Sequence, residues 1–216
     1  MHTSIVPSPF RKLVLSLAVI AGTLLPADKA KAAEAAVPSG ASIISEFHTT
    51  LLNVMKDADK LGVAGRFDTL APAVDKAFHL DLTARQAAGR RPWKAAKPDE
   101  QTALLASFRK WTIATYANQF DGWSGQSFVD LGEKPGPQKG TLLVETELTG
   151  KEPVYLTYLM VLKDGRWGVY DVLVRRGSTS ISQLAKHISE FKSVVKSGLP
   201  ALTNTLTDKT KMLLGE

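Results

Sequence analysis

The chain has 216 residues, of which 44% are hydrophobic and 22% are charged, and its formal net charge is +6. These fractions lie in the range of globular proteins, so they argue against disordered and fibrous classes. The chain contains no cysteine, which excludes a disulfide framework, thiolate catalysis and zinc–thiolate sites.

The N-terminal segment has the three parts of a secretory signal peptide. Arg11 and Lys12 precede an apolar stretch over residues 13–25, and Ala30-Lys31-Ala32 follows in the A-x-A form that signal peptidases accept. The apolar stretch is shorter than the ~20 residues that a membrane-spanning helix requires. We therefore predict a signal peptide over residues 1–32, with a buried N-terminal helix as the alternative.

Removal of residues 1–32 would take away four basic residues and one acidic residue, which lowers the net charge from +6 to +3. A charge of this size gives little support to nucleic-acid binding. We expect a flexible leader over residues 33–41, rich in Ala, Pro, Ser and Gly, and then a single domain over residues 42–216. The predicted signal peptide implies export from the cytoplasm. We expect this protein, which forms no disulfides, to be periplasmic after export.

Apolar residues spaced three or four positions apart predict helices in the first part of the domain. We expect the first helix to have its N-cap near Ser42 and to end at Gly62. Pro72 is tolerated in the second helix only if it lies in the first turn of that helix. The long fourth helix begins at Pro98. The expected segments are helices at 42–62, 67–78, 80–88 and 98–119, with a basic loop at 89–97.

The hydrophobic period changes to two after Gly125, which predicts strands. Asp164-Gly165 is a hairpin signal. The expected strands are 126–131, 142–148, 154–162 and 167–174, and helices follow at 181–195 and 199–213. The sequence therefore predicts an α+β fold, in which N- and C-terminal helices cover an antiparallel sheet of about four strands.

The sequence lacks the usual motifs of hydrolases, zinc peptidases and nucleotide-binding proteins. Its histidines, His2, His48, His79 and His187, share no spacing typical of metal ligands. His187 and Glu190 would share a helix face, but two ligands do not make a site. We expect neither a metal nor a cofactor.

Asp171 lies in the middle of a predicted strand, and two roles fit it. A buried carboxylate has a raised pKa and can act as a general base, with Tyr158 and His79 as helpers, as in cone-shaped α+β isomerases. Alternatively, Asp171 accepts hydrogen bonds that order the junction between the sheet and the next helix. We favour the structural role.

Five cations lie within 13 residues around Trp93: Arg85, Arg90, Arg91, Lys94 and Lys97. Such a cluster fits anionic head groups or an acidic partner, with Trp93 at the interface. The alternative, which we favour, is a solvated loop with Trp93 packed inward.

Residues 154–162 are apolar at almost every position, as in a strand that is covered on both faces. Helices rich in Leu, Phe and Trp are available to cover it. Periodicity alone cannot distinguish a filled core from a ligand cavity.

Four segments together resemble the MlaC family of periplasmic lipid carriers, also called the toluene-tolerance auxiliary family. They are Phe-Arg-Lys-Trp at 108–111 continuing to Tyr116, Trp-Ser-Gly-Gln at 123–126, Asp-Gly-Arg-Trp-Gly-Val-Tyr-Asp-Val at 164–172, and the segment 178–191. The resemblance covers about residues 43–210. Residues 180–184 and 189–191 look closer to the hopanoid-associated HpnM-type branch, whereas Arg175-Arg176 and residues 80–97 depart from the family pattern.

The resemblance implies a binding protein rather than an enzyme. Family members hold lipid chains in an apolar cavity between a curved sheet and helices. They shuttle lipid between an outer-membrane lipoprotein complex and an inner-membrane ABC transporter assembly. The cargo implied here is a phospholipid or a hopanoid-type lipid, and two chains would need a cavity of roughly 500 Å³ or more.

Alternation in the strands and helical spacing make eight residues candidates for the cavity lining, and so for lipid binding. They are Phe108, Trp111, Val144, Leu156, Tyr158, Met160, Val169 and Leu173. Two other functions remain open: a small cone-fold enzyme that uses Asp171 as its base, and an adaptor that bridges membrane complexes without binding lipid.

Overall fold

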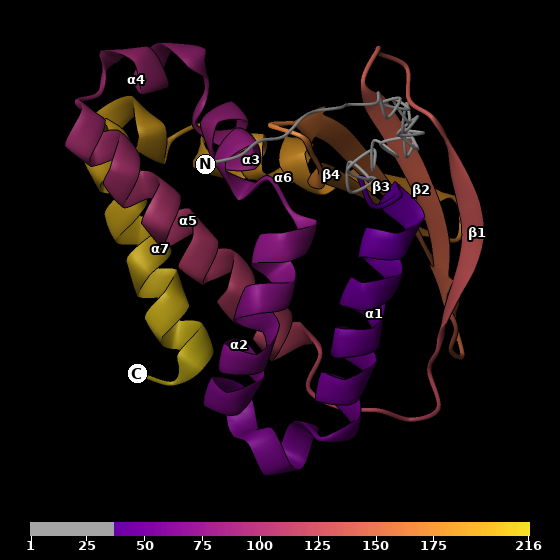
Figure 1. Cartoon of the computed structure of the whole chain (residues 1–216). Helices are drawn as coiled ribbons and strands as arrows, with labels where there is room; N and C mark the ends of the chain where they lie inside the picture. The colour runs from indigo at the N-terminus through magenta and orange to yellow at the C-terminus, as the bar shows by residue number, and fades with distance from the viewer. Residues whose placement is uncertain (1–36) are drawn as a thin grey trace, which may run out of the picture. The chain divides into compact units, whose positions relative to one another are not determined.

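The computed structural model describes residues 37–216, which belong to one compact unit (Figure 1). The helices of the first part are α1 (Gly40–Lys56), α2 (Ala58–Ala77), α3 (Leu80–Ala88), α4 (Arg90–Ala95) and α5 (Pro98–Gln119). The strands are β1 (Phe128–Pro135), β2 (Thr141–Leu148), β3 (Val154–Lys163), β4 (Arg166–Arg176) and β5 (Thr179–Ser182). The chain ends with α6 (Gln183–Phe191), the 3₁₀ helix η1 (Val194–Ser197) and α7 (Leu199–Leu214).

The expected signal peptide at 1–32 and most of the expected leader at 33–41 lie outside the described residues. Helix α1 begins two residues earlier than predicted, at Gly40. Its N-cap is Ser39, whose hydroxyl accepts a hydrogen bond from the Ser42 amide, whereas we had expected the cap near Ser42.

The first two helices divide differently from the prediction. Helix α1 ends at Lys56 and α2 starts at Ala58, while Gly62, the predicted stop, is a kink inside α2 with φ of 61°. Pro72 lies within α2 rather than in its first turn. Buried Arg66 of α2 donates to the carbonyl oxygens of Ala58 at 3.1 Å and Ala117 at 2.7 Å. These bonds connect the kinked start of α2 to the end of α5.

Two short elements were missed in the sequence. The expected basic loop at 89–97 contains α4, a helix of six residues. Residues Thr179–Ser182, which we had expected to begin a helix, instead form strand β5 beside β4. The sheet therefore has five strands rather than four.

The sheet is antiparallel throughout, and its strands follow the order of the chain from β1 to β5. The predicted turn at Asp164-Gly165 joins β3 and β4, and both residues have positive φ, as a two-residue hairpin turn requires. Figure 1 shows the strands curving around α1.

A β-bulge interrupts the pairing of β3 with β4. Leu159 pairs with Asp171, but Met160 pairs with Val169, so Tyr170 is an extra residue on β4. Cross-strand partners lie on the same face of a sheet. Val172, the partner of Tyr158, therefore shares a face with Val169, and the simple alternation along β4 breaks at Tyr170.

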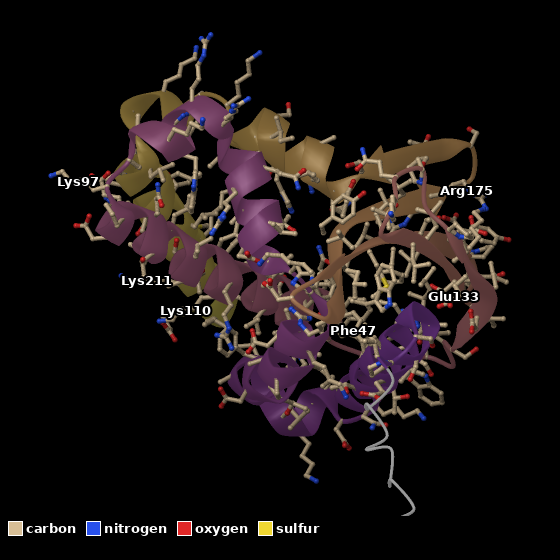
Figure 2. All side chains as sticks on the ribbon, turned by 45° about the horizontal axis from the view of Figure 1, so that its top comes forward. Phe47, Lys97, Lys110, Glu133, Arg175 and Lys211 are labelled. Atoms are coloured by element: carbon tan, nitrogen blue, oxygen red, sulfur yellow. The ribbon has the colours of Figure 1, made fainter. Side chains whose placement is uncertain are left out.

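The interior has two hydrophobic clusters. The first joins α1, α2 and the C-terminal half of α5 to the sheet, and Figure 2 shows Phe47 of α1 inside it. The second joins α3, the N-terminal half of α5, α6 and α7. Helix α7 packs along α5 rather than on the sheet (Figure 1). Of the two C-terminal α-helices, α6 is therefore the one that covers the sheet, through β4. Helix α5 contributes to both clusters and is their common support.

Candidate functional site

A cavity of about 240 Å³ lies where β3 and β4 face α5 and α6. Helix α5 supplies Phe108, Trp111, Thr112, Thr115, Tyr116 and Gln119, and Phe120 follows it. The sheet supplies Leu148, Val154, Leu156, Tyr158, Val169, Tyr170, Asp171, Val172, Val174 and Arg176. The remaining walls come from Phe78, Leu80 and Thr83 and from Gln183, Leu184, Lys186, His187 and Glu190 of α6.

Apolar and aromatic side chains dominate these walls, and the charged lining residues are Asp171, Arg176, Lys186 and Glu190. Arg176, Lys186 and Glu190 are exposed to solvent, so they mark the mouth of the cavity. The Lys186 Nζ lies 3.8 Å from a Glu190 carboxylate oxygen, whereas Arg176 has no acidic partner within residues 37–216. The site is therefore an apolar chamber with a polar, partly cationic entrance.

Five of the eight residues predicted to line a cavity line this one: Phe108, Trp111, Leu156, Tyr158 and Val169. Three elements bring them together: the middle of α5 and the central strands β3 and β4. Their role in lipid binding stays a prediction.

Val144 and Met160 do not line the cavity. They lie on the expected face of the sheet, but both are fully buried beneath the start of α1. A Cβ at Gly40 would lie 3.1 Å from the Met160 Sδ and 3.1 Å from a Val144 methyl carbon. The absence of a side chain at Gly40 lets α1 close over these two residues, so Met160 lies in the packed core, while Val144 lines a separate cavity of about 120 Å³ between α1 and the sheet.

Leu173 is also outside the cavity, because the bulge at Tyr170 reverses the faces of β4. Leu173 pairs with Thr157 and therefore lies on the face opposite to Tyr158 and Val172. We had placed Leu173 and Val169 on one face by simple alternation. A bulge leaves no clear mark in the sequence, so alternation could not reveal the change.

Tyr158, which lines the cavity, is hydrogen-bonded to a buried partner on α1. Its hydroxyl shares a hydrogen bond of 2.8 Å with the His48 Nε2, and the His48 ring stacks on Phe128 at a centroid distance of 3.7 Å. Burial lowers the pKa of His48 from 6.5 to about 4, against a weaker opposing effect of Asp130. Burial also raises the pKa of Tyr158 well above its usual value. Both groups are therefore neutral at pH 7.

Asp171 caps the start of α6. Its Oδ1 accepts hydrogen bonds from the amides of Val172 at 2.7 Å and Leu184 at 2.9 Å. Its Oδ2 accepts from the Ser182 hydroxyl at 2.6 Å, and the same hydroxyl oxygen accepts from the Ala185 amide at 2.9 Å. Both carboxylate oxygens thus have protein donors, which is the geometry expected for ordering the sheet-to-helix junction.

The proposed helpers of a base do not converge on Asp171. The Tyr158 hydroxyl is bonded to His48. The His79 Nδ1 accepts from the Arg166 guanidinium at 2.9 Å, and its Nε2 lies 3.2 Å from the Arg166 carbonyl oxygen. Nothing in this geometry favours general base catalysis by Asp171.

The basic segment lies away from the cavity lining. Arg85, Arg90, Arg91, Lys94 and Lys97 are all exposed, and none of them forms an ion pair within residues 37–216. Trp93 packs against the second hydrophobic cluster, and the Arg85 guanidinium lies 5.0 Å from its ring centroid. The inward packing of Trp93 agrees with the alternative that we favoured, although the segment is helical. Figure 2 shows Lys97 where α4 leads into α5.

His187 of α6 lines the cavity, although it was not among the predicted site residues. The hydrophobic stripe of α6 predicted an inward face through Leu184, Ile188 and Phe191, but Ile188 is exposed and His187 lines the cavity. The one signal available was the spacing of His187 from Leu184 and Phe191, which places the three on one helix face.

Within the described part of the chain, no group of three or more His, Asp or Glu side chains is arranged to hold a metal ion. Among residues 37–216 there is also no helix with the length and apolar character needed to cross a membrane.

Comparison with known proteins decides the family. A family model described as MlaC protein matches residues 45–208, which include every wall of the cavity. The chain belongs to the MlaC family. Among curated proteins, none matches the sequence significantly.

This MlaC-family chain is also similar in structure to a phospholipid-binding protein from Ralstonia solanacearum that was solved in complex with a phospholipid. The TM-score is 0.68 at 19% sequence identity, over 82% of this chain and 99% of the other. At this identity the likeness shows the fold alone. The α+β fold with a curved antiparallel sheet, predicted from the sequence, is confirmed.

Proposed function

We propose that this protein is a periplasmic lipid carrier that holds the acyl part of a lipid in the cavity between β3, β4, α5 and α6. The observation that carries the proposal is an apolar chamber with a charged mouth in a chain of the MlaC family. The phospholipid bound to the Ralstonia solanacearum protein, which has the same fold, supports it.

The charge at the mouth favours a phospholipid over a neutral polycyclic lipid. Arg176 and Lys186 are exposed there, and a phosphate group attracts both guanidinium and ammonium groups. A hopanoid without an anionic group would gain nothing from these cations. The HpnM-type resemblance of residues 180–191 therefore does not determine the cargo.

The cavity must widen to hold a complete lipid. A cavity of 150 Å³ is known to bind benzene, so by proportion one of 240 Å³ holds roughly ten carbon atoms. This is less than one long acyl chain and about half of the volume that we expected. We propose that α6 and the adjacent part of α5 move apart when the chains enter, because these helices form the wall opposite the sheet.

Lipid transfer needs no chemical step. Burying ~30 methylenes is worth about 24 kcal/mol relative to water, but a bilayer offers nearly the same stabilisation. The equilibrium between membrane and carrier is therefore close to balanced, and partners have only to lower the extraction barrier. We propose that these partners are an inner-membrane ABC transporter assembly and an outer-membrane lipoprotein complex, reached after export through the signal peptide.

A bulky side chain in the chamber tests the proposal. Leu156 of β3 lines the cavity, so Leu156→Trp should fill it and reduce the bound lipid at least tenfold. Leu162→Trp is the matched control, because Leu162 is on the same strand but 44% exposed and outside the cavity. Both variants would be purified and extracted, and phospholipid would be quantified against protein.

Equal lipid content in Leu156→Trp, Leu162→Trp and the wild type would refute this placement of the lipid. Circular dichroism and thermal unfolding of each variant would show whether the fold is retained.

A further inference from the structure

His187 of α6 occupies a polar position in an otherwise aromatic part of the cavity wall. Its ring centroid lies 4.9 Å from Trp111, 5.9 Å from Phe108 and 5.8 Å from Phe191. Trp111 and Phe108 meet it edge to face, and Phe191 stacks on it. These contacts fix the imidazole plane, so its nitrogens point in set directions.

The Nδ1 of His187 is buried and has no hydrogen-bond partner within the described residues. Leaving a buried polar atom unpaired is unfavourable, so native structures usually pair such atoms with protein, water or ligand. The side chain lines the cavity but the Nδ1 itself is covered, so a ligand group would reach this atom when α5 and α6 move apart as proposed above.

Several other polar groups of the wall are already paired within the protein. The hydroxyls of Thr83, Thr112 and Thr115 donate to backbone carbonyl oxygens at 2.8 to 2.9 Å. Tyr158 is bonded to His48, and both oxygens of Asp171 have donors. Among the lining residues described, His187 is the one with a side-chain polar atom that is both fully buried and without a hydrogen-bond partner.

The ring is neutral at pH 7. Burial lowers the pKa of His187 from 6.5 to about 4, although Glu190 and Asp171 oppose this shift, whereas Lys186 and Lys209 reinforce it. A neutral imidazole has one N–H donor and one acceptor nitrogen, so with its proton on Nδ1 it can donate to an ester carbonyl oxygen. The phosphate of a lipid would instead meet the exposed cations Lys186 and Arg176.

We propose that His187 selects the cargo by hydrogen bonding to an ester carbonyl of an acyl lipid, at the junction of its head group and chains. The inference rests on the proposed function. His187 is adjacent in sequence to Lys186 at the mouth, so a lipid whose phosphate lies there places its ester groups near the imidazole. Ether-linked and purely hydrocarbon lipids lack this carbonyl and leave the His187 Nδ1 unpaired.

Two probes separate this role from general apolar contact. The wild type and variants, each stripped of lipid, would be titrated with diacyl phosphatidylglycerol and with its dialkyl ether analogue of equal chain length. We expect the wild type to bind the ester lipid about five- to tenfold more tightly than the ether lipid, as one net hydrogen bond provides. In His187→Phe, which keeps a ring but no polar atom, this ratio should fall to about one.

Two further variants make the result specific. In His187→Asn the amide can reach the same carbonyl, so part of the ester preference should return. Ile188→Phe is the matched control, because Ile188 is the next residue of α6, is 45% exposed and does not line the cavity. It should keep the wild-type ratio.

An ester-to-ether ratio near one in the wild type, or an unchanged ratio in His187→Phe, would overturn the role of His187 while leaving the lipid carrier intact. Failure of the wild type to bind either lipid would overturn the proposed function together with this inference.

Discussion

At the scale of single residues, Asp171 of β4 accepts three hydrogen bonds, from the Val172 amide of its own strand, the Ser182 hydroxyl at the end of β5 and the Leu184 amide of α6. The sequence placed this carboxylate in a strand beside a helix start and favoured the structural role. It could not show the amide of Leu184, because that contact depends on where β5 turns into α6.

Replacing Asp171 with Ala should lower the free energy of unfolding by about 2–4 kcal/mol, because a charged acceptor is removed and buried donors lose their partner. Ser182→Ala, which removes only the hydroxyl that bridges Asp171 and the Ala185 amide, should cost about 1 kcal/mol. Urea denaturation measures both values. A cost for Asp171→Ala no larger than that of Ser182→Ala would contradict the capping role.

His48 makes stability depend on pH in a defined window. Its folded pKa of about 4 lies below the ordinary value of 6.5, so the unfolded chain binds a proton first as the pH falls. The contribution is fully present above pH 6.5 and is lost between pH 6.5 and 4, up to about 3 kcal/mol. In His48→Gln, which can still bond to Tyr158, unfolding measured from pH 7 to 4 should show a shallower loss. An identical slope in the variant would rule out His48 as a source of acid sensitivity.

At the scale of elements, the long and periodic segments were predictable and the short ones were not. Helix α5 was expected at 98–119 and spans Pro98–Gln119, because its apolar spacing and Pro98 agree. Strand β5 was missed because Ile181 continued a helical stripe, and pairing with β4 overrode that local preference. The bulge at Tyr170 was missed for a similar reason, since it is a feature of the pairing and not of composition.

One close contact holds β4 against the corner between α2 and α3. A Cβ at Gly168 would overlap the His79 ring, which two hydrogen bonds with Arg166 hold in place. Gly168→Ala should therefore cost about 1–3 kcal/mol, as overpacking does in other cores. Gly150→Ala is the control, because its new Cβ would meet nothing closer than 3.8 Å. Equal thermal stability of the two variants would contradict this account, because it would show that the His79 ring shifts to accommodate the added methyl group at little cost in free energy.

At the scale of the whole molecule, the sequence predicted which apolar residues face inward from the sheet, apart from Leu173. It did not predict which of them are covered by helices and which line the cavity. Val144, Met160 and Tyr158 share one face of the sheet. Helix α1 closes over the first two, while Tyr158 remains in the cavity wall. This division depends on where α1 begins and where α5 crosses, which are properties of the assembled fold.

The cavity also affects overall stability. At ~24 cal/mol per Å³, an unfilled volume of 240 Å³ costs about 6 kcal/mol, comparable to the stability of many domains. We expect the protein to unfold at a lower temperature after its lipid is removed, and to regain stability when diacyl phosphatidylglycerol is added. Calorimetry of the two forms measures the difference, and equal unfolding temperatures would indicate a chamber that collapses without cost.

The most direct test of the lipid-carrier account is the lipid content of the protein itself. The protein, expressed as the full chain in a bacterium, would be purified without detergent and extracted with organic solvent, and the extract would be analysed by mass spectrometry. We expect about one diacyl phospholipid per chain. A lipid-free extract from folded protein, which also takes up no phospholipid from vesicles, would contradict the account.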